Sequence, residues 1–547
     1  MILLKKYKNR ALAGMIFGLI ACLPLACIKD KGNYDYHDVN SVTISGIENS
    51  YFVPLGQPLK ITPTLTFSVS ETKDSFKYEW HLLGGSYNSS AGVLSSERNL
   101  DIIVGKPITK DGDYNIVYCV TNKTTGIRYD YRFRLQVRDR MLNGYIMLCE
   151  RENNSFDIDL ISIYNDTLTQ YHNVLDIYNS QMPRTDRKPL DIVCYNDYPS
   201  PKLGAPSDWR KYAVWILTDK GTERVRVENF EWQPDFDISG LSVIPEKYLQ
   251  GEKLIAEKMS APVAGLSTTA GVNYIYYKGN WFWYNWPGGR SYLYLFPVNA
   301  ASPTSEPYKT SPYIFTYATR AALFFNEDAN RFEWQNSNSS GNSSAALCTK
   351  RFSADNEYFN WENPDYRLIY MDNRDYVSGF AVVKNVSSGK YEFLQMMVQG
   401  LNQSPKKLGQ AEFPAGLDME SVKFYAYHNS LPYLFCATED RLYRINTTVM
   451  QQWDDVTSSV LTSGHKISKV KSSAIRFAGS NRIIVATYDP SGQAGINGQL
   501  ALYNVQDGTG DLTLAKHPSS PTPDGYQIDM KWTGFGKIIN VDYKEPK

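Results

Sequence analysis

Short strand–turn–strand patterns recur along roughly the last 400 residues of this 547-residue chain. Seven pairs of runs rich in β-branched and aromatic residues are each joined by turn residues, and long helical periodicity is rare. The pairs are 145–149 with 156–164, 211–217 with 222–227, 273–277 with 291–298, 321–325 with 331–334, 366–371 with 380–384, 434–437 with 441–445, and 482–488 with 498–505. Such a chain must bury its apolar faces between sheets, so the pattern predicts an all-β fold.

Hairpins repeated over this length favour a β-propeller of about seven blades, because radial closure leaves only short strand edges. We therefore assign residues 140–547 to a propeller-like domain. The repeats carry no WD, kelch or Asp-box signature, so six or eight blades stay open, and two stacked β-sandwiches are the alternative fold. Residues 526–531 and 537–541 are strand-like and are expected to supply the closing strand.

The N-terminus has the pattern of a secretory signal. Residues 1–10 carry four basic side chains, and residues 11–26 are apolar and uncharged. The apolar run is shorter than the roughly 20 residues of a spanning helix, although a single N-terminal anchor helix is the alternative. Residues 1–26 are therefore expected to be a signal peptide.

The apolar run ends in Ala26-Cys27, which resembles the cleavage site of a bacterial lipoprotein, where the cysteine becomes the lipidated first residue. Cys22 fits the lipobox consensus better, since Pro24 lies in the box before Cys27. Cys27 is nevertheless favoured, because cleavage there leaves the polar start Cys-Ile-Lys-Asp-Lys, which partly resembles lipoprotein export signals. The expected location is the outer membrane, lipid-anchored through Cys27 and exposed at the cell surface.

A small β-sandwich is expected after a polar tether at residues 27–40. Residues 41–139 hold about seven short strand patterns, and Lys123-Thr124-Thr125-Gly126 forms a clear hairpin turn between two of them. This spacing, with a central tryptophan, is typical of an immunoglobulin-type sandwich, so Trp80 is expected to pack between its sheets.

The sequence from Cys27 to about residue 140 resembles the PKD-like family of outer-membrane lipoproteins. The resemblance rests on the start Cys27-Ile-Lys-Asp-Lys-Gly-Asn-Tyr-Asp-Tyr36, the Gly56-x-Pro58 turn, Tyr78-Glu79-Trp80 and a late Tyr118-Cys119-Val120 strand. The aspartate-rich WDFGDG-type strand of ordinary PKD repeats is missing. The resemblance implies an accessory lipoprotein that accompanies a SusC/SusD-type importer in nutrient uptake.

Charge and residue spacing exclude several functions. Lys+Arg and Asp+Glu both number 57, so no global field draws the chain to nucleic acid. The six histidines are isolated, and we find no GxSxG elbow or P-loop, so neither a metal nor another cofactor is expected. The cysteines from Cys119 onward are scattered and are expected to be small buried apolar residues rather than disulfides.

Aromatic residues are abundant, with 40 Tyr, 23 Phe and 11 Trp, and they gather in two segments. In residues 281–290, strand alternation places Trp281 and Trp283 on one face and Phe282 and Tyr284 on the other, with Trp286 near a loop tip. The candidate ligand-binding residues are Tyr284, Asn285, Trp286 and Arg290, with Trp361 from a second segment at 358–366. Blade packing is the alternative role for both segments.

These patterns predict a non-catalytic surface protein that binds a nutrient polymer, expected to be a glycan, or docks on a SusC/SusD-type importer. A glycoside hydrolase or lyase on the same fold is one alternative, although no catalytic motif supports it. A purely structural transporter subunit is the other.

Overall fold

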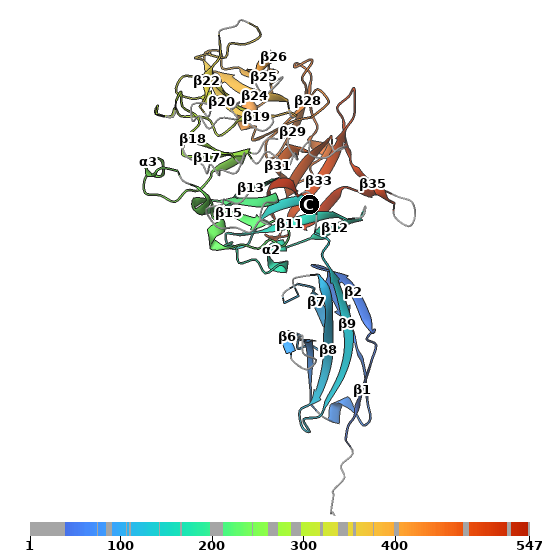
Figure 1. The fold of residues 1–547 in the computed structure, drawn as a ribbon. Helices are drawn as coiled ribbons and strands as arrows, with labels where there is room; N and C mark the ends of the chain where they lie inside the picture. Colours follow the sequence, from blue (N-terminus) through green and yellow to red (C-terminus); the bar gives the residue numbers. More distant parts are fainter. Residues whose placement is uncertain are drawn as a thin grey trace, which may run out of the picture.

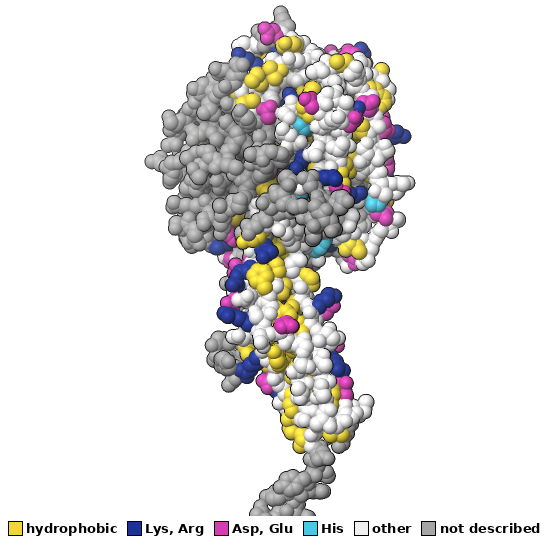
Figure 2. All heavy atoms as spheres, turned by 90° about the vertical axis from the view of Figure 1, so that its right-hand side faces the viewer, with side chains coloured by type: hydrophobic (Ala, Val, Ile, Leu, Met, Phe, Trp, Pro, Cys, Tyr) yellow, Lys and Arg dark blue, Asp and Glu magenta, His cyan; other side chains and the backbone are white. Residues whose placement is uncertain are grey.

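The computed structural model describes residues 39–544, except 74, 84–89, 106, 109–110, 142, 165–166, 197–211, 243, 261–271, 286–296, 303, 318–320, 337–347, 354–356, 376, 399–403, 474–480 and 522–526. Nearly all its regular structure is β-strand; the described α-helices, α2 (Val174–Ile177) and α3 (Glu246–Leu249), are single turns. A narrow N-terminal domain carries a broader C-terminal domain (Figure 1). Figure 2 shows the same narrow stalk and broad head from the side.

The N-terminal domain is a sandwich of short strands. Its larger sheet has the order β2 (Ser50–Pro54), β9 (Arg128–Arg138), β8 (Gly112–Asn122), β5 (Phe76–Leu83) and β6 (Ser90–Ser95). The pairs β1 (Val42–Ser45) with β4 (Thr64–Phe67), and β3 (Pro58–Ile61) with β7 (Leu100–Ile103), complete it. Only β2 with β9 is a parallel pair among the described strand pairs of this domain.

Trp80 is fully buried in this sandwich, as expected from the sequence. Its ring centroid lies 4.2 Å from that of Tyr118, and its indole N–H donates to the Glu97 carbonyl at 3.0 Å. The predicted turn at 123–126 joins β8 to β9, where Thr121 faces Arg128 in the register. The immunoglobulin-type sandwich predicted from sequence is therefore confirmed.

The main body of the C-terminal domain consists of seven antiparallel sheets in the described residues, built mostly from consecutive strands. The first four sheets, from the inner strand outward, are β38 (Ile538–Lys544), β10 (Gly144–Arg151), β11 (Ser155–Tyr164) and β12 (Thr167–Tyr171); β13 (Pro189–Asn196), β14 (Tyr212–Thr218) and β15 (Gly221–Arg226); β16 (Lys258–Ser260), β17 (Val272–Tyr277) and β18 (Asn280–Asn285); and β19 (Phe315–Tyr317), β20 (Ala321–Asn326), β21 (Arg331–Asn336) and β22 (Lys350–Arg351).

The remaining three sheets follow the same plan. They are β23 (Tyr366–Asn373), β24 (Ser378–Asn385), β25 (Tyr391–Met397) and β26 (Lys406–Glu412); β27 (Phe424–Tyr427), β28 (Tyr433–Ala437), β29 (Leu442–Asn446) and β30 (Trp453–Asp455); and β31 (Lys466–Ser472), β32 (Arg482–Tyr488), β33 (Gly498–Val505) and β34 (Leu512–Leu514), with β37 (Lys531–Phe535) on β33. The hairpin β35 (Lys516–Pro521) and β36 (Gln527–Asp529) stands apart from them.

The sheets close into a ring through the C-terminal strand. β38 pairs with β10, so the end of the chain supplies the inner strand of the first blade. β38 also contacts β13 and β31, the inner strands of the blades on either side. This closure confirms the predicted propeller and the role of the strand at 537–541, whereas residues 527–529 belong to the separate hairpin.

One predicted strand pair is wrong. β17 pairs on one edge with the aromatic run of β18, with Tyr274 facing Trp283 and Tyr276 facing Trp281, and on its other edge with β16. Residues 291–296 of the predicted partner lie outside the described residues. The two-residue link Lys278-Gly279 makes a tighter hairpin than the sequence analysis assumed, with positive φ of 47° and 77°. In the other six predicted pairs, the two strands do pair with each other in the structure.

The two domains share a continuous apolar cluster. It runs from the sandwich core through Leu55 and Val104 to Tyr171 and Ile177, which lie at the end of β12 and in α2. A Cβ placed on Gly56 would lie 2.8 Å from side-chain atoms of both Tyr171 and Ile177, so the sandwich approaches the first blade closely. The stalk is therefore packed against the propeller rather than joined by a free linker.

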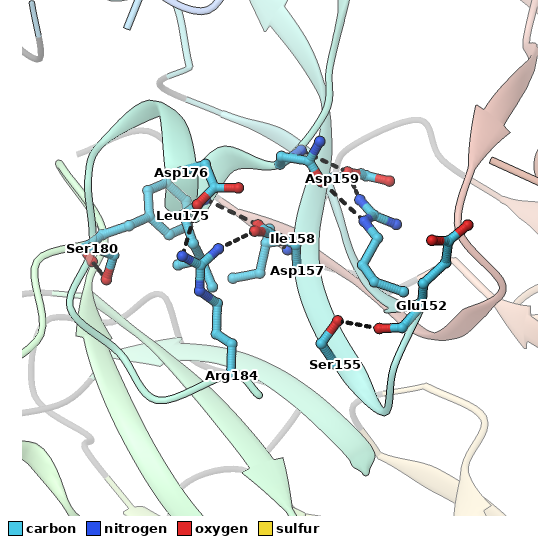
Figure 3. Close-up of polar contacts among 12 residues, drawn as sticks. Glu152, Ser155, Asp157, Ile158, Asp159, Leu175, Asp176, Ser180 and Arg184 are labelled. Carbon is cyan, nitrogen blue, oxygen red and sulfur yellow. Dashed lines mark hydrogen bonds and ion pairs between the residues drawn. The ribbon is translucent and has the colours of Figure 1, made fainter. Parts of the chain in front are cut away.

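Two buried aspartates of β11 fix the segment that makes this contact (Figure 3). Asp157 accepts a hydrogen bond from the backbone N–H of Leu175 at 3.1 Å, and Arg184 donates to its other oxygen. Asp159 forms an ion pair with Arg151. Buried carboxylates with such partners hold α2 on the first blade.

Candidate functional site

The inner strands of the propeller surround a central cavity of about 380 Å³. β13, β16, β23, β27, β31 and β38 all contribute lining residues, together with Tyr313 and Ile314 just before β19. Every blade therefore reaches the cavity. Concave sites at the convergence of several elements are where proteins commonly bind small ligands.

Register irregularities precede three of the cavity-lining side chains. The pairing slips before Asp191 in β13, before Tyr370 in β23 and before Lys469 in β31. A β-bulge changes the direction of the following side chains, and such bulges are common beside functional sites. After two of these slips, side chains two residues apart, Tyr370 with Asp372 and Lys469 with Lys471, line the cavity.

Three tyrosines from neighbouring blades form a row along the cavity. The ring centroids of Tyr313 and Tyr370 lie 4.9 Å apart, and those of Tyr370 and Tyr425 lie 5.0 Å apart with nearly parallel planes. The Tyr370 hydroxyl donates to Asp372 at 2.8 Å. The buried hydroxyl of Tyr425 has no hydrogen-bond partner among the described residues. Tyr313 and Tyr370 are half-buried, whereas Tyr425 is 5% exposed, so the first two rings are the accessible ones of the row.

The carboxylates of the cavity are satisfied mostly by neutral donors. Asp191 accepts from the Asn540 side chain and from the backbone N–H of Ile192. Asp542 accepts from the backbone N–H of Cys194 at 2.7 Å. Its ion pair with Lys471 is long, at 3.8 Å. Neutral donors therefore hold these carboxylates in place, and Lys471 is the cavity lysine that forms an ion pair with one of them.

Lys258 and Lys469 form no ion pair with any described residue. The ammonium of Lys258 lies 4.0 Å from the centre of the Tyr313 ring. Burial lowers the pKa of Lys258 to about 8, and Lys469 adds to that effect, while Asp372 and Asp191 oppose it. Burial likewise lowers the pKa of Lys469. Both side chains carry a charge that the surrounding protein solvates poorly.

Part of the aromatic run proposed from the sequence lies in blade cores, and the rest lies outside the described residues or has only its backbone described. Trp281 and Trp283 are buried together in one cluster, and Phe282 is buried in another, so the predicted alternation is confirmed for these three residues. Tyr284 and Asn285 lie in β18, and the structure describes only their backbone. Trp286 and Arg290 lie outside the described residues.

Trp361, from the second aromatic segment, is in a core. It is 3% exposed and stacks on Phe352 with ring centroids 4.1 Å apart. Phe359 and Phe332 pack on its edge. Its indole is thus covered by protein and offers no free face to a ligand in this conformation. Tyr358, at 61% exposure, is the accessible ring of that segment.

The remaining sequence-derived groups are placed as follows. Cys22 and Cys27 lie outside the described residues. The five later cysteines are buried and none of them is in a disulfide, in agreement with their predicted packing role. Within the described part of the chain, no group of His, Cys, Asp and Glu side chains is arranged to hold a metal ion.

Sequence reasoning missed the cavity. Its signal is present in β31, where Lys469 and Lys471 alternate with the buried Val470, and in β23, where Tyr370 and Asp372 flank Met371. Charged residues at alternate positions usually mark a solvated strand face. Only ring closure shows that these strands are the inner ones.

One family model matches the N-terminal part of the chain. Residues 27–183 match the model of the PKD-like family, a range that continues past the sandwich into the first blade. No curated protein matches the chain.

Solved structures resemble the chain only distantly. A quinonprotein alcohol dehydrogenase-like protein from Bacteroides thetaiotaomicron is 9% identical, with 91% of this chain and 97% of that chain covered at a TM-score of 0.41. AztD from Citrobacter koseri is 10% identical, with 86% and 98% covered at 0.31. PorZ from Porphyromonas gingivalis is 8% identical, with 76% and 54% covered at 0.17. Likeness at this level says nothing about function.

Proposed function

We propose that this chain is a lipid-anchored outer-membrane protein that binds a nutrient polymer without catalysis, taking a chain end into the central cavity of its propeller. The observation that carries the proposal is the row of Tyr313, Tyr370 and Tyr425 beside charged groups from the other blades. Aromatic faces with a few convergent polar groups suit a sugar ring, whose C–H face packs on the aromatic side chain.

The N-terminal domain serves as a spacer in this proposal. β1 lies at the end of the sandwich opposite the propeller (Figure 1), and the described chain begins just before it. A lipid on Cys27 would therefore leave the propeller at the far end from the membrane. The basic and apolar pattern of residues 1–26 supports such an anchor. No helix in the described part of the chain is long and apolar enough to cross a bilayer.

The expected partner is a SusC/SusD-type importer, and the expected ligand is a glycan. The match of residues 27–183 to the PKD-like family supports this context. In the sequence-derived site, Tyr284, Asn285, Trp286 and Arg290 would give a longer polymer a second contact.

The test is retention of a glycan panel by the full-length protein purified in detergent. Tyr370→Ala should weaken retention roughly 30-fold, since loss of a central aromatic anchor commonly costs about 2 kcal/mol or more. Tyr358→Ala removes the exposed ring of the second aromatic segment and should leave retention unchanged. Loss of binding in Tyr358→Ala alone would move the site to that surface, and turnover of any glycan would make the protein an enzyme.

A further inference from the structure

The cavity has more cationic side chains than its own acids neutralise. Among the described residues that line it are five cations and three carboxylates. Lys423 is paired with Glu439 at 2.6 Å, and Lys471 is near Asp542. Lys258 and Lys469, from blades three and seven, remain without a carboxylate at ion-pair distance among the described residues.

Arg374 adds a third cation of this kind. Its guanidinium donates to two backbone carbonyls, those of His428 at 3.1 Å and Leu431 at 3.3 Å, and lies over the Tyr427 ring. No described carboxylate is paired with it. Neutral partners orient this side chain and leave its charge uncompensated.

A charge kept in an enclosed place without a counter-charge is costly for the folded protein. The chain nevertheless places these cations from separate blades around one cavity, and β-bulges direct the neighbouring positions into it. An anion entering the cavity would replace the missing counter-charge and form charge-assisted hydrogen bonds.

The tyrosine row restricts which anion fits. A small inorganic ion has no apolar surface that could pack on adjacent aromatic rings. A flexible acidic peptide has few flat apolar faces that could stack on them. A sugar ring that bears a carboxylate matches both features, because its C–H face packs on a tyrosine while its carboxylate meets an ammonium.

We propose that the central cavity selects acidic saccharides, with the carboxylate of a hexuronate unit bound between Lys258 and Lys469 and its ring packed on the half-buried Tyr313 and Tyr370. This inference rests on the proposed binding function and assigns the ligand class of that same site.

The experiment compares two ligand forms that differ only in their carboxylates. Oligogalacturonate and oligoglucuronate are titrated calorimetrically into the full-length protein in detergent, alongside the same oligosaccharides after reduction of the carboxyls to primary alcohols. We expect at least one acidic form to bind about 10-fold or more tighter than its reduced form, as expected for one charged hydrogen bond.

Matched variants locate the effect. Lys258→Met and Lys469→Met should each lose the preference for the acidic form, and Lys258→Arg should keep it because the charge remains. Lys390→Met is the control, since Lys390 is an exposed residue of the propeller paired with Glu412 at 2.7 Å. Thermal melting shows whether each variant is folded, and Lys258→Met should melt no lower than the parent at pH 7.

The outcomes separate the two proposals. Equal binding of acidic and reduced forms overturns the carboxylate selection and leaves the binding function in place. Failure of these oligosaccharides and of every member of the glycan panel overturns both. Equal binding of poly-glutamate overturns the saccharide assignment, because the rings would then contribute no selection.

Discussion

The ammonium of Lys258 lies 4.0 Å from the centre of the Tyr313 ring, so a cation from the third blade rests on an aromatic face from the fourth. The Lys258 ammonium makes this cation–π contact and forms no ion pair with any described residue. Its position beside the tyrosine row connects the charge and the stacking surface of the cavity in one site.

Binding of an acidic saccharide should depend on pH through Lys258. Its pKa of about 8 in the free protein means that the ammonium is charged below that pH and neutral above it. A uronate carboxylate stays ionised throughout this range, since carboxyl pKa values lie near 4. Affinity should therefore fall as pH rises from 7 to 9.

Calorimetry across that range checks the dependence. Asp191, Asp372, Lys469 and Tyr313 face Lys258, and of these Lys469 also has a pKa lowered by burial. In Lys258→Met the decline between pH 7 and 9 should become shallower. An affinity that stays constant to pH 9 in the parent protein would show that Lys258 takes no part.

The aromatic run of β18 predicts a large stability difference between two tryptophans. Trp283 is 6% exposed and packed with Trp281 in a blade core, so Trp283→Ala should lower the free energy of unfolding by about 3–5 kcal/mol. Trp286→Ala should lower the melting temperature little and weaken glycan retention if its loop contacts the polymer. Denaturant unfolding and glycan retention measure both effects. Unchanged stability of Trp283→Ala would contradict the buried position.

Gly56 reports on the junction between the domains. Its φ is +80°, and a Cβ there would lie 2.8 Å from atoms of Tyr171 and Ile177. Gly126, with φ of +73° and no neighbour within 4 Å of its Cβ position, is the matched control. Gly126→Ala should cost about 1–2 kcal/mol through backbone strain alone. Gly56→Ala should cost about 1–3 kcal/mol more, through crowding of the junction.

Differential scanning calorimetry of the full-length protein distinguishes these two variants. If the Gly56→Ala and Gly126→Ala proteins have the same melting temperature, the sandwich moves freely on the propeller. Expression of residues 28–139 alone is the complementary test, and we expect a folded all-β unit.

Asp157 and Arg184 predict a pH-dependent loss of stability. Burial raises the pKa of Asp157 to about 7, even though Arg184 and backbone amides favour its ionised form. Its ordinary pKa is near 4, so the native state binds the proton more tightly and this group's stabilisation fades as pH rises from about 4 to 7. In Arg184→Met, the carboxylate loses its cation and the decline should continue to higher pH.

The measurement is urea unfolding of parent and Arg184→Met proteins at pH 5 and pH 8.5. Removing one partner of a buried ion pair commonly costs about 3–5 kcal/mol when the other stays charged. The difference between the two proteins should therefore be larger at pH 8.5. A difference that is the same at both pH values would mean that Asp157 does not titrate in this range.

Membrane attachment depends on Cys27 in our account. Cys27→Ala should release the protein from membranes, because the apolar leader is a poor anchor by itself. Fractionation and immunoblotting measure this. Retained attachment with Cys22 intact would assign the lipid to Cys22.

Most of the fold could be predicted because a hairpin is local: its strands and its turn lie within about 20 residues of each other. Trp80 and the aromatic alternation in β18 follow from the same periodicity of two. The partner of β17 was misassigned because Lys278-Gly279 leaves a turn so short that strand and turn merge into one aromatic segment.

The blades also repeat in a way that the sequence alone conceals. Asn326 donates to the buried Glu333 at 2.9 Å, and Asn385 donates to the buried Glu392 at 3.3 Å. Both pairs join the end of a second strand to the third strand of a blade. Two shared residues per blade are too few to reveal a repeat in the sequence. The equivalence of the blades is therefore visible only in the three-dimensional structure.

The cavity could not be predicted, because its residues come from strands far apart in the chain. Lys258 and Lys469 are brought to one site by closure of the ring through β38. The pattern of either strand alone is that of an ordinary solvated strand.

A crystal structure of the protein with a bound acidic oligosaccharide tests the central claim most directly. The account predicts sugar density inside the central cavity, with a carboxylate at the ammonium groups of Lys258 and Lys469 and a ring against Tyr370. An empty central cavity with density only at the Trp286 loop, or at the exposed Tyr358, would contradict it.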